Sequence, residues 1–595
     1  DAAGRVVAEE GFDGLRRTYD RDAAGRVITV HRPAGRTTRY AYHADGQVSS
    51  TTHNDEAPIT YEYDGAGALV AAHTAATSVR FERDALGHVT REQQGIHTVD
   101  YEYDARGQRT YLHSSLGADF SWQHDVMGNL MAVQAGGHWQ ARLQHDARGL
   151  EVQRQLSGGV QQSWQYDTLG RPTRQQVQAR GGARQRTYYW QGTDQLTAID
   201  DSLAGTTHYT YDALGALTGA RYPDDQEELR LADAVGNLFR TPALNDRTYN
   251  AGGQLRTANG THYHYDAEGN LLRKTAATGQ QWQYSWDGAG QLVRVRLPNG
   301  YQVTFTYDAL GRRVAKRYRG RVSRWVWASD VPLHEWQELE RGAETGSIQD
   351  LSTWLFEENS FVPTAKLTKQ GAYSVVADHL GTPLALYDEQ GQPAWTMTLD
   401  SYGAVRHGQG KPQDCPFRYQ GQYEDVETGL YYNRFRYYDP EVGGYISQDP
   451  IGLNGGTHEY AYVNSPTTYC DPLGLYPWSY TNMPKLDGFQ LHHIVPRSLG
   501  NHEVFKLAQF NVDNISNTIY LPKAREYHPT RSIHNGWNRY HKAYNERMLG
   551  NMDDLLEYGK AEGWTQKEFE QGLKELIAGE RQELRQGKVK LHPCG

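Results

Sequence analysis

The chain has 595 residues, among them 41 tyrosines, 13 phenylalanines and 62 glycines, and this composition favours a mainly β protein with many tight turns. Its three cysteines have no CxxC spacing, which argues against a disulfide scaffold and against a cysteine zinc site. The sequence has no apolar run of about 18 residues that could cross a membrane and no recognisable signal peptide.

Charge is divided unevenly along the chain. Residues 476–595 hold 16 lysines and arginines against 14 acidic residues, a charge of +2, whereas the whole chain carries −10. The first 475 residues therefore carry −12, which is −10 minus +2. This change of sign indicates that the C-terminal part has an anionic partner that the rest of the chain lacks.

A short motif with aromatic residues, an aspartate and a glycine recurs through most of the chain. Clear copies of the pattern Tyr-x-Tyr-Asp-x-x-Gly begin at Tyr61, Tyr101, Trp164, Tyr209, Tyr263 and Phe305. The aspartate position recurs every 20 or 21 residues from Asp22 to Asp167. A period of this length is typical of a repeat array, in which each unit buries its apolar face against its neighbours.

Each repeat predicts a β-hairpin. Alternating aromatic and polar residues indicate a strand with one buried face, and the aspartate can accept hydrogen bonds from backbone amides to begin a turn. The glycine suits a turn position with positive φ. An apolar residue two places later, such as Leu69 or Leu271, begins the return strand.

These repeats are specific enough to identify a family. They resemble the YD repeats of Rhs proteins, a group that includes the C components of Tc toxins and the teneurins. Residues 419–440 resemble the terminal segment of an Rhs core, and together the two resemblances cover residues 1–475. The resemblance implies a hollow β-shell around a separate C-terminal polypeptide, whereas periodicity alone also allows a plain β-solenoid without cargo. We therefore expect a YD-repeat shell over residues 1–410, a core-terminal segment over 411–475 and a C-terminal toxin over 476–595.

Two Asp-Pro-x-Gly motifs end the repeat region. Asp449 begins the first, and after eighteen intervening residues Asp471 begins the second, which continues to Leu475. Either motif alone is a routine turn, in which the carboxylate caps, proline presets φ and glycine closes. The pair resembles the self-cleavage signature of Rhs cores, DPxG-x18-DPxGL. The resemblance implies that Asp449 and Asp471 form an aspartyl-protease-like pair, which cuts the bond between Leu475 and Tyr476 in a single turnover.

The sequence departs from the family pattern next to this signature. Gly443-Gly444-Tyr445 stands where the family has Gly-Arg followed by an aromatic residue. A positive charge beside two carboxylates alters how strongly they hold a proton, so its loss would matter. Arg434 and Arg436 are the nearby positive charges that could replace the missing arginine.

After residue 475 the repeats stop and helical spacing appears. Thr565 and Glu568 read as a capping box, and the apolar spacing that follows predicts an amphipathic helix over 565–586. The apolar stripe of this helix is expected to belong to a core and to carry no chemistry of its own. The C-terminal part is therefore predicted to be an α+β domain that differs from the repeats.

Histidines are concentrated in this part of the chain. Seven of the 24 lie in the last 120 residues, and His492 and His493 are adjacent in an apolar stretch. Their order, followed by Asn517, His534 and His541, resembles the His-His branch of the HNH or endonuclease VII-like nucleases. The pattern is similar to the group with an Ala-His-His motif, with leucine in place of that alanine here. The residues alone also allow a pair of strand histidines in a small core.

The resemblance to these ββα-metal nucleases implies a role for each residue. Neighbouring residues on a strand point to opposite faces, so one histidine can bind a metal ion while the other faces the attacking water. The implied ligands of a divalent metal ion, zinc or magnesium, are His492, His534 and His541. The implied general base is His493, and Asn517 orients it. Basic residues that could contact phosphates are Lys523, Arg525, Arg531 and Arg539.

Together the resemblances predict an antibacterial secreted toxin. Its Rhs shell encapsulates a metal-dependent nuclease, which autoproteolysis releases and which cleaves nucleic acid, with DNA favoured over RNA. An RNase in the same shell and a non-catalytic repeat protein for adhesion or carbohydrate binding are the alternatives. The family implies a cognate immunity protein and a type VI-like secretion route, in which a spike protein and a chaperone engage the part that precedes Asp1. It also implies synthesis in the bacterial cytoplasm and action in the cytoplasm of the target cell.

Overall fold

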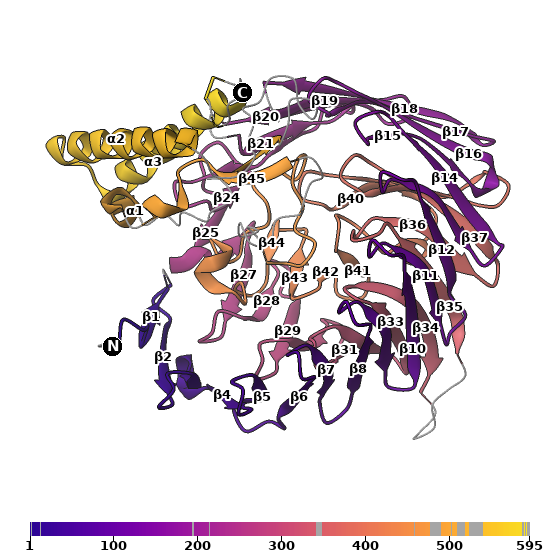
Figure 1. Cartoon of the computed structure of the whole chain (residues 1–595), viewed down its shortest axis with the longest axis horizontal. Coiled ribbons are helices and arrows are strands. Elements are labelled where there is room, and N and C mark those ends of the chain that lie inside the picture. Colours follow the sequence, from indigo (N-terminus) through magenta and orange to yellow (C-terminus); the bar gives the residue numbers. More distant parts are fainter. Residues whose placement is uncertain are drawn as a thin grey trace.

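Most of the chain forms two large antiparallel sheets, one of 22 strands and one of 16 (Figure 1). The computed structural model describes residues 1, 3–11, 13–192, 195–212, 215–340, 348–456, 458–475, 489–500, 502–508, 518–522, 539–585, 588, 589 and 591. Among these residues, no helix combines the length and the apolar character that crossing a membrane requires. The mainly β class with a small C-terminal α+β region is confirmed.

The first sheet is a meander in which each strand pairs antiparallel with the next strand in the chain. Its strands are β1 (Ala8–Glu10), β2 (Arg16–Arg21), β3 (Val27–His31), β4 (Thr37–Tyr42), β5 (Val48–His53), β6 (Ile59–Tyr63), β7 (Leu69–His73), β8 (Ser78–Arg83), β9 (Val89–Gln94), β10 (His97–Tyr103), β11 (Arg109–Ser114), β12 (Asp119–His124), β13 (Leu130–Ala135), β14 (Trp139–His145), β15 (Glu151–Leu156), β16 (Val160–Tyr166), β17 (Pro172–Ala179), β18 (Gly182–Gln191), β19 (Gln195–Asp201), β20 (Gly205–Tyr211), β21 (Leu217–Arg221) and β22 (Glu227–Leu229). A two-stranded sheet of β23 (Leu231–Ala232) and β24 (Leu238–Phe239) follows.

The second large sheet is a meander of the same kind. Its strands are β25 (Arg247–Tyr249), β26 (Leu255–Ala258), β27 (Thr261–Tyr265), β28 (Leu271–Thr275), β29 (Gln281–Trp286), β30 (Leu292–Arg296), β31 (Gln302–Tyr307), β32 (Arg313–Tyr318), β33 (Arg321–Ala328), β34 (Val331–Leu339), β35 (Gln349–Phe356), β36 (Pro363–Thr368), β37 (Gly371–Ala377), β38 (Pro383–Tyr387), β39 (Pro393–Leu399) and β40 (Val405–Gln409).

Two smaller units complete the chain. A four-stranded sheet contains β41 (Tyr423–Asp425), β42 (Leu430–Asn433), β43 (Arg436–Asp439) and β44 (Gly444–Tyr445). The C-terminal part contains β45 (Phe489–His493), α1 (Glu503–Ala508), β46 (Thr518–Pro522), α2 (Arg539–Ala561) and α3 (Gln566–Arg585). Helix α3 lies where the capping box and the apolar spacing predicted a helix.

The Asp-x-x-Gly turns have the predicted construction. Oδ1 of Asp125 accepts hydrogen bonds from the amides of Met127 at 2.8 Å and Asn129 at 2.9 Å. The amide of Gly128 donates to the Asp125 carbonyl oxygen at 3.1 Å, and its φ of 92° is one that residues with a Cβ rarely adopt. Strands β7 and β28 begin at the apolar residue two places after the glycine, as the repeat pattern predicts.

In several repeats the last aromatic residue of the motif bonds to the preceding repeat. The hydroxyl of Tyr103 donates to the carbonyl oxygen of Val89 at 2.9 Å, and the hydroxyl of Tyr166 donates to that of Glu151 at 2.7 Å. The same bond is made by Tyr42, Tyr211 and Tyr307, and by the indole nitrogen of Trp286. Phenylalanine has no such donor, so this bond contributes to the excess of tyrosine in the chain.

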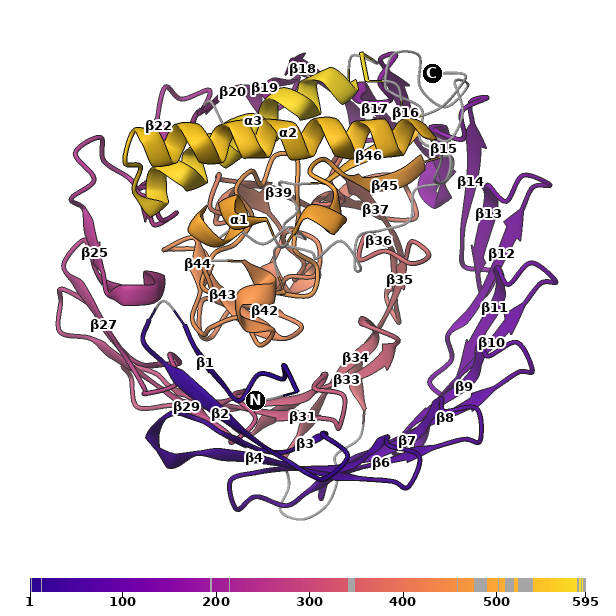
Figure 2. The same ribbon diagram turned by 60° about the vertical axis from the view of Figure 1, so that its left-hand side comes forward.

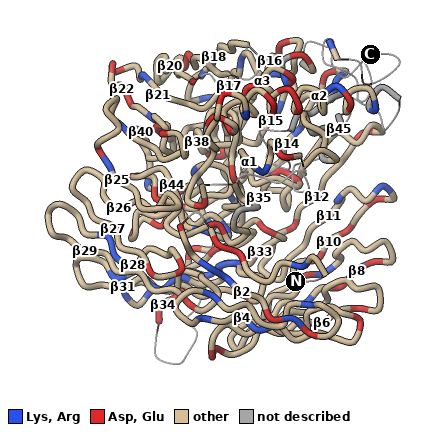
Figure 3. The backbone as a smooth tube through the Cα atoms, turned by 90° about the vertical axis from the view of Figure 1, so that its left-hand side faces the viewer, with Lys and Arg blue, Asp and Glu red and all other residues tan. Residues whose placement is uncertain are grey.

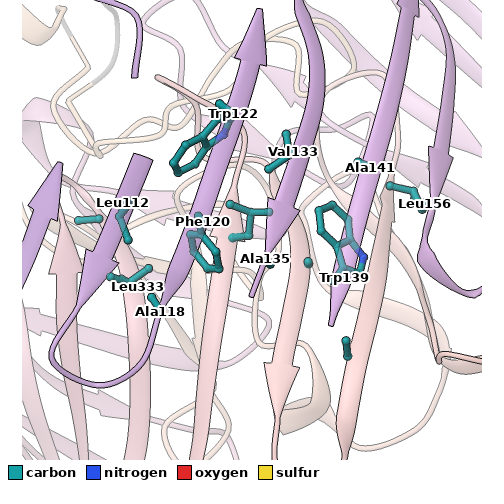
Figure 4. Close-up of a cluster of buried hydrophobic side chains, with 14 of the residues drawn as sticks. Leu112, Ala118, Phe120, Trp122, Val133, Ala135, Trp139, Ala141, Leu156 and Leu333 are labelled. Carbon is teal, nitrogen blue, oxygen red and sulfur yellow. The ribbon is translucent and has the colours of Figure 1, made fainter. Parts of the chain in front are cut away.

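Over part of the shell the two large sheets pack face to face. Strands β10–β17 and β33–β38 share one hydrophobic core, in which the side chains of Phe120 and Trp139 are almost fully buried (Figure 4). The indole nitrogen of Trp139 donates to Ser374 Oγ at 2.8 Å, and Gln175 Nε2 donates to the Ala377 carbonyl oxygen at 2.7 Å. Segments about 200 positions apart are therefore closed into a double wall.

The core-terminal segment and the C-terminal domain occupy different places. Figure 2 shows β42–β44 within the space around which the large sheets curve, and α2 and α3 at its rim. Buried apolar residues between Ile494 and Leu591 form a core of their own, to which no described shell residue contributes. Figure 3 shows basic and acidic residues interspersed along the shell strands rather than gathered by sign.

Candidate functional site

The core-terminal segment is organised around buried tyrosines. The cluster contains Tyr419, Tyr431, Tyr438, Tyr445 and Tyr462. Strand β43 begins at Arg436, whose guanidinium lies 3.7 Å from the centre of the Tyr445 ring. This cation–π contact and the surrounding rings hold an arginine in the interior, where it is 1% exposed.

The two predicted catalytic aspartates lie on either side of this arginine. Nη2 of Arg436 lies 2.9 Å from Asp449 Oδ2 and 3.6 Å from Asp471 Oδ2. Neither carboxylate is more than 1% exposed. The contact with Asp449 has the distance of an ion pair but not the alignment of a hydrogen bond. Two carboxylates that share one cation in a dry site are the arrangement that can divide acid and base roles.

Both Asp-Pro-x-Gly motifs are also real turns. Asp449 Oδ1 accepts the amide hydrogen of Ile451 at 3.0 Å, and Asp471 Oδ1 accepts that of Leu475 at 3.0 Å. The same two side chains therefore cap turns and form the carboxylate pair. The second bond places the Asp471 carboxylate beside Leu475, the residue that precedes the expected cleavage site. Tyr476, on the other side of that bond, lies outside the described residues.

Arg436, not Arg434, occupies the place beside the aspartates. Its Nε contacts the carbonyl oxygen of Gly474, and its Nη1 donates to that of Glu459 at 2.8 Å. Arg434 turns away, and its Nε donates to Asp330 Oδ1 at 2.8 Å. A positive charge is therefore present at the pair although Gly-Gly replaces the Gly-Arg of the family pattern.

Burial dominates the electrostatics of this cluster. It raises the pKa of Asp449 to about 6, while the Arg436 guanidinium acts to lower that pKa and the Asp471 carboxylate acts to raise it. Burial, together with the nearby Asp13, also raises the pKa of Glu459 to about 7. The site therefore contains a carboxyl group that holds its proton in mildly acidic solution.

Three further residues contact Asp471 that the sequence motifs did not indicate, and one of them, Tyr462, accepts the Asp471 amide hydrogen on its hydroxyl oxygen at 3.4 Å. The hydroxyl of Tyr445 lies 2.7 Å from Asp471 Oδ2, and Asn433 Nδ2 lies 2.9 Å from the Asp471 carbonyl oxygen. An aromatic residue at position 445 is expected from the family pattern. Nothing in the spacing signals that its hydroxyl reaches a carboxylate.

The C-terminal domain contains the hairpin on which the histidine pair lies. Strands β45 and β46 are antiparallel, with His492 opposite Ile519 and His493 opposite Thr518. Helix α2 follows the hairpin in the chain, and the hydroxyl of Tyr544 in this helix donates to the carbonyl oxygen of Ile494 at 2.5 Å. The first half of α2 is therefore fastened to the end of β45, in the order strand, strand, helix.

The structure describes the backbone at four of the predicted nuclease residues. Outside the described residues are Asn517, Lys523, Arg525, Arg531 and His534. The backbones of His492, His493, Arg539 and His541 are described, but their side chains are not. His502 has a structural contact, since its Nε2 lies 3.0 Å from Asp553 Oδ1.

The backbone arrangement is compatible with a metal ion held by histidines. His541 precedes Tyr544 by three residues in α2, and the Tyr544 hydroxyl bonds to the residue that follows His493. The chain positions of His492, His493 and His541 are thus brought into one region, and imidazoles suit zinc and other transition metals. Among the side chains that the structure does describe, no group of three His, Cys, Asp or Glu residues is placed to hold a metal ion.

Comparison with protein families assigns the two parts of the chain to two models. The teneurin YD-shell model matches residues 15–176 and 161–459. A model described as a nuclease family of the HNH/ENDO VII superfamily with conserved AHH matches residues 475–579. The boundary between the two matches falls in the core-terminal segment that contains the aspartate pair.

Individual relatives are similar over most of the chain. The double-stranded DNA deaminase toxin A of Burkholderia cenocepacia is 29% identical over 80% of this chain and 41% of its own length. The toxin protein Tse5 of Pseudomonas aeruginosa is 32% identical over 72% of this chain and 38% of its own length. This chain therefore spans about two fifths of either relative. The crystal structure of TcdB2-TccC3 covers 79% of this chain and 29% of its own with a TM-score of 0.67, and at 18% identity it supports the fold alone.

Proposed function

Because the chain belongs to the teneurin YD-shell family, we propose that it is an antibacterial toxin of the Rhs type, whose shell holds a C-terminal nuclease. The observation that carries this proposal is the buried cluster of Asp449, Arg436 and Asp471 beside Leu475. Along the sequence, the cluster lies between the repeats of the shell and a domain with its own core. A cut after residue 475 would separate the two.

Self-cleavage requires one group that takes a proton from water and another that gives a proton to the departing amine. Water attacks the carbonyl carbon of Leu475 and forms the new C–O bond, while one carboxylate takes a proton from that water. The C–N bond to Tyr476 breaks as the other carboxyl group gives its proton to the nitrogen. The products are the Leu475 carboxyl group and the Tyr476 amine. Arg436 contacts the Gly474 carbonyl as well as both aspartates, which supports a role in alignment.

Denaturing electrophoresis of the freshly purified whole chain tests the self-cleavage step. The unchanged chain should give two fragments, the smaller with the size of residues 476–595. Asp449→Asn and Asp471→Asn should each leave one full-length band, because loss of acid or base catalysis slows such steps by about 10²–10⁴-fold.

Asp388→Asn is the matched control for these two variants. Asp388 accepts the amide hydrogens of Gln390 and Gln392 in an ordinary shell turn, so this variant should still give two fragments. Two fragments from the Asp471 variant would contradict the assignment.

We further propose that residues 476–595 cleave nucleic acid, with DNA favoured over RNA. The family match and the order of β45, β46 and α2 support this activity. In the proposal His493 takes the proton of the attacking water, and Asn517 orients its imidazole. A divalent cation, zinc or magnesium, would supply Lewis acid chemistry at the scissile phosphate when bound by His492, His534 and His541. The residues proposed to contact phosphates are Lys523, Arg525, Arg531 and Arg539.

Incubation of the released C-terminal fragment with DNA and with RNA, each with and without a chelator, tests the nuclease. DNA should be cut only in the absence of chelator, and His493→Ala should lower the rate by about 10²–10⁴-fold. His592→Ala, which changes a histidine outside the motif, should leave the rate unchanged. Cleavage of RNA alone would favour the RNase alternative. If neither polymer is cut with any divalent cation, the non-catalytic repeat protein for adhesion or carbohydrate binding is favoured.

A nuclease that its producer survives needs confinement, so we propose a cognate immunity protein and storage of the toxin inside its own shell. The proposed route is synthesis in the bacterial cytoplasm, type VI-like secretion, and action in the cytoplasm of the target cell. A spike protein and a chaperone would engage the part of the protein that precedes Asp1. The toxin names of the two relatives support this setting. Loss of viability on expression of the C-terminal fragment, and its rescue by His493→Ala, would be the expected result.

A further inference from the structure

The environment of the two aspartates is not symmetric. Asp471 accepts a hydrogen bond on each oxygen, from the Leu475 amide at 3.0 Å and from the Tyr445 hydroxyl at 2.7 Å. Asp449 accepts one on Oδ1, from the Ile451 amide, and its Oδ2 accepts no aligned hydrogen bond from any residue the structure describes. Asp471 thus accepts a hydrogen bond from a side chain, the Tyr445 hydroxyl, whereas no described side chain donates an aligned hydrogen bond to Asp449.

The direction of this hydrogen bond is fixed by Asn433. Nδ2 of Asn433 lies 2.9 Å from the Asp471 carbonyl oxygen, which can only accept, so the amide nitrogen and not the amide oxygen must face this region. The same nitrogen lies 2.7 Å from the Tyr445 hydroxyl oxygen. Because that nitrogen is a donor, the tyrosine oxygen accepts there, and its own hydrogen is left to point at Asp471 Oδ2.

We propose that Tyr445, oriented by Asn433, is a positioning residue that holds the Asp471 carboxylate as a hydrogen-bond acceptor and thereby decides which aspartate is the base. A carboxylate that accepts a hydrogen bond on each oxygen is held in a fixed orientation, as Asp471 is by the Leu475 amide and the Tyr445 hydroxyl. Asp471 is then the group that takes the proton of the attacking water. Asp449 is the group that holds the proton and gives it to the departing amine. This inference rests on the proposed self-cleavage.

The proton and electron balance follows from this assignment. Asp471 begins as a carboxylate and ends with the proton that the water loses as its oxygen bonds to the Leu475 carbonyl carbon. Asp449 begins protonated and ends as a carboxylate, because its proton goes to the nitrogen of Tyr476 when the C–N bond breaks. No oxidant, reductant or further reactant is needed.

The groups around the pair act on the two aspartates in different directions. Burial, together with the adjacent Asp471 carboxylate, raises the pKa of the Tyr445 hydroxyl well above its usual value, so the hydroxyl remains a donor. The other titratable or charged groups that face the pair are Arg436, Glu459, Tyr462 and Cys470. Arg436 lies closer to Asp449, at 2.9 Å, than to Asp471, at 3.6 Å, so its charge by itself favours an ionised Asp449. Burial acts in the opposite direction and raises the pKa of Asp449 to about 6.

The test compares self-cleavage of the whole chain with that of Tyr445→Phe over a range of pH. Each chain is collected in denaturant after cell-free synthesis and diluted into buffers from about pH 4 to about pH 8, and fragment formation is followed. Loss of a hydrogen bond donated to a carboxylate disfavours its charged form, so the acidic limb of the Tyr445→Phe profile should move up by about one pH unit. Cleavage on that limb should then fall about tenfold.

Tyr438→Phe is the matched control. Tyr438 belongs to the same buried cluster, and its hydroxyl donates to the Tyr402 carbonyl oxygen at 2.5 Å without contacting either aspartate. This variant should lose comparable stability and keep the pH profile of the unchanged chain. A Tyr445→Phe profile that coincides with that of the unchanged chain would overturn the inference while leaving self-cleavage intact. If the unchanged chain is not cut at any pH, the proposed self-cleavage fails and this inference fails with it.

A second replacement covers the case in which Tyr445→Phe does not fold. Replacement of Tyr445 by 3-fluorotyrosine keeps the shape of the ring and makes the hydroxyl a stronger donor. The acidic limb should then move in the opposite direction, to lower pH. An unmoved limb in the fluorinated chain would count against the role of the hydroxyl.

Discussion

The shell and the C-terminal domain are stabilised in different ways. The shell repeats one local turn and adds links between distant segments, such as Glu92 with Arg312 and Trp139 with Ser374, which are 220 and 235 positions apart. The C-terminal domain takes its buried apolar residues from within residues 494–591. One part depends on closure of distant segments, and the other has a core that needs no shell residue. A single cut between them would therefore leave both cores intact.

The first way to test this comparison is to open the shell and leave the C-terminal domain unchanged. Arg312 contacts Asp308 Oδ2 at 2.8 Å and Glu92 Oε1 at 2.5 Å, and all three side chains are 2% exposed. Arg312→Ala leaves two buried carboxylates without their counter-charge, so the shell should lose about 3–5 kcal/mol of unfolding free energy. Calorimetry of the whole chain should show a lower shell transition and an unmoved C-terminal transition.

Arg221→Ala serves as the control for this change. Arg221 pairs with Asp225 at 2.7 Å, but their side chains are 57% and 81% exposed, so no measurable change in either transition is expected. Equal shifts of both transitions in the Arg312 variant would show that the two parts do not unfold separately.

The rate of the self-cleavage that separates the two parts should depend on pH. Burial raises the pKa of Asp449 to about 6, so this carboxyl group is protonated below that pH and loses its proton above it. Because the proposed acid acts only in its protonated form, the rate of self-cleavage should fall about tenfold for each pH unit above about 6. Time courses of fragment formation measure this directly. A rate that rises with pH through this range would contradict the acid role.

The smallest expected effect lies in the C-terminal domain alone. The buried hydroxyl of Tyr544 donates to the Ile494 carbonyl oxygen, and Tyr544→Phe removes this bond without changing the ring. The C-terminal transition should lose about 1 kcal/mol while the shell transition stays in place. Tyr558→Phe, at a tyrosine that is 59% exposed, should change neither transition. A shift of the shell transition in the Tyr544 variant would indicate that the two parts are coupled.

The repeat turns could be predicted from sequence because they depend on neighbours a few positions apart. The hydrogen bond that the Asn129 amide donates to the Asp125 carboxylate spans four residues, and the aspartate-to-glycine spacing indicates it. The contact of Glu92 with Arg312 could not be predicted, because no local pattern determines which strands of a long array meet. Curvature of the whole sheet decides that contact.

The sequence likewise predicted only part of the candidate site. The spacing and the family resemblance singled out Asp449 and Asp471, but Arg434 and Arg436 were equivalent in the sequence. Arg434 has a φ of 56° in the turn between β42 and β43, which directs its side chain away, whereas Arg436 lies on the strand that faces the aspartates. The contact of the Tyr445 hydroxyl with Asp471 depends on the register between strands, which aromatic spacing does not reveal.

The most direct test of the whole account is the intact mass of the freshly purified chain after denaturation. Two polypeptides are expected, one ending at Leu475 and one beginning at Tyr476, and the Asp471→Asn chain should give a single full-length mass. A single full-length mass for the unchanged chain, or a cut at any other bond, would contradict this account.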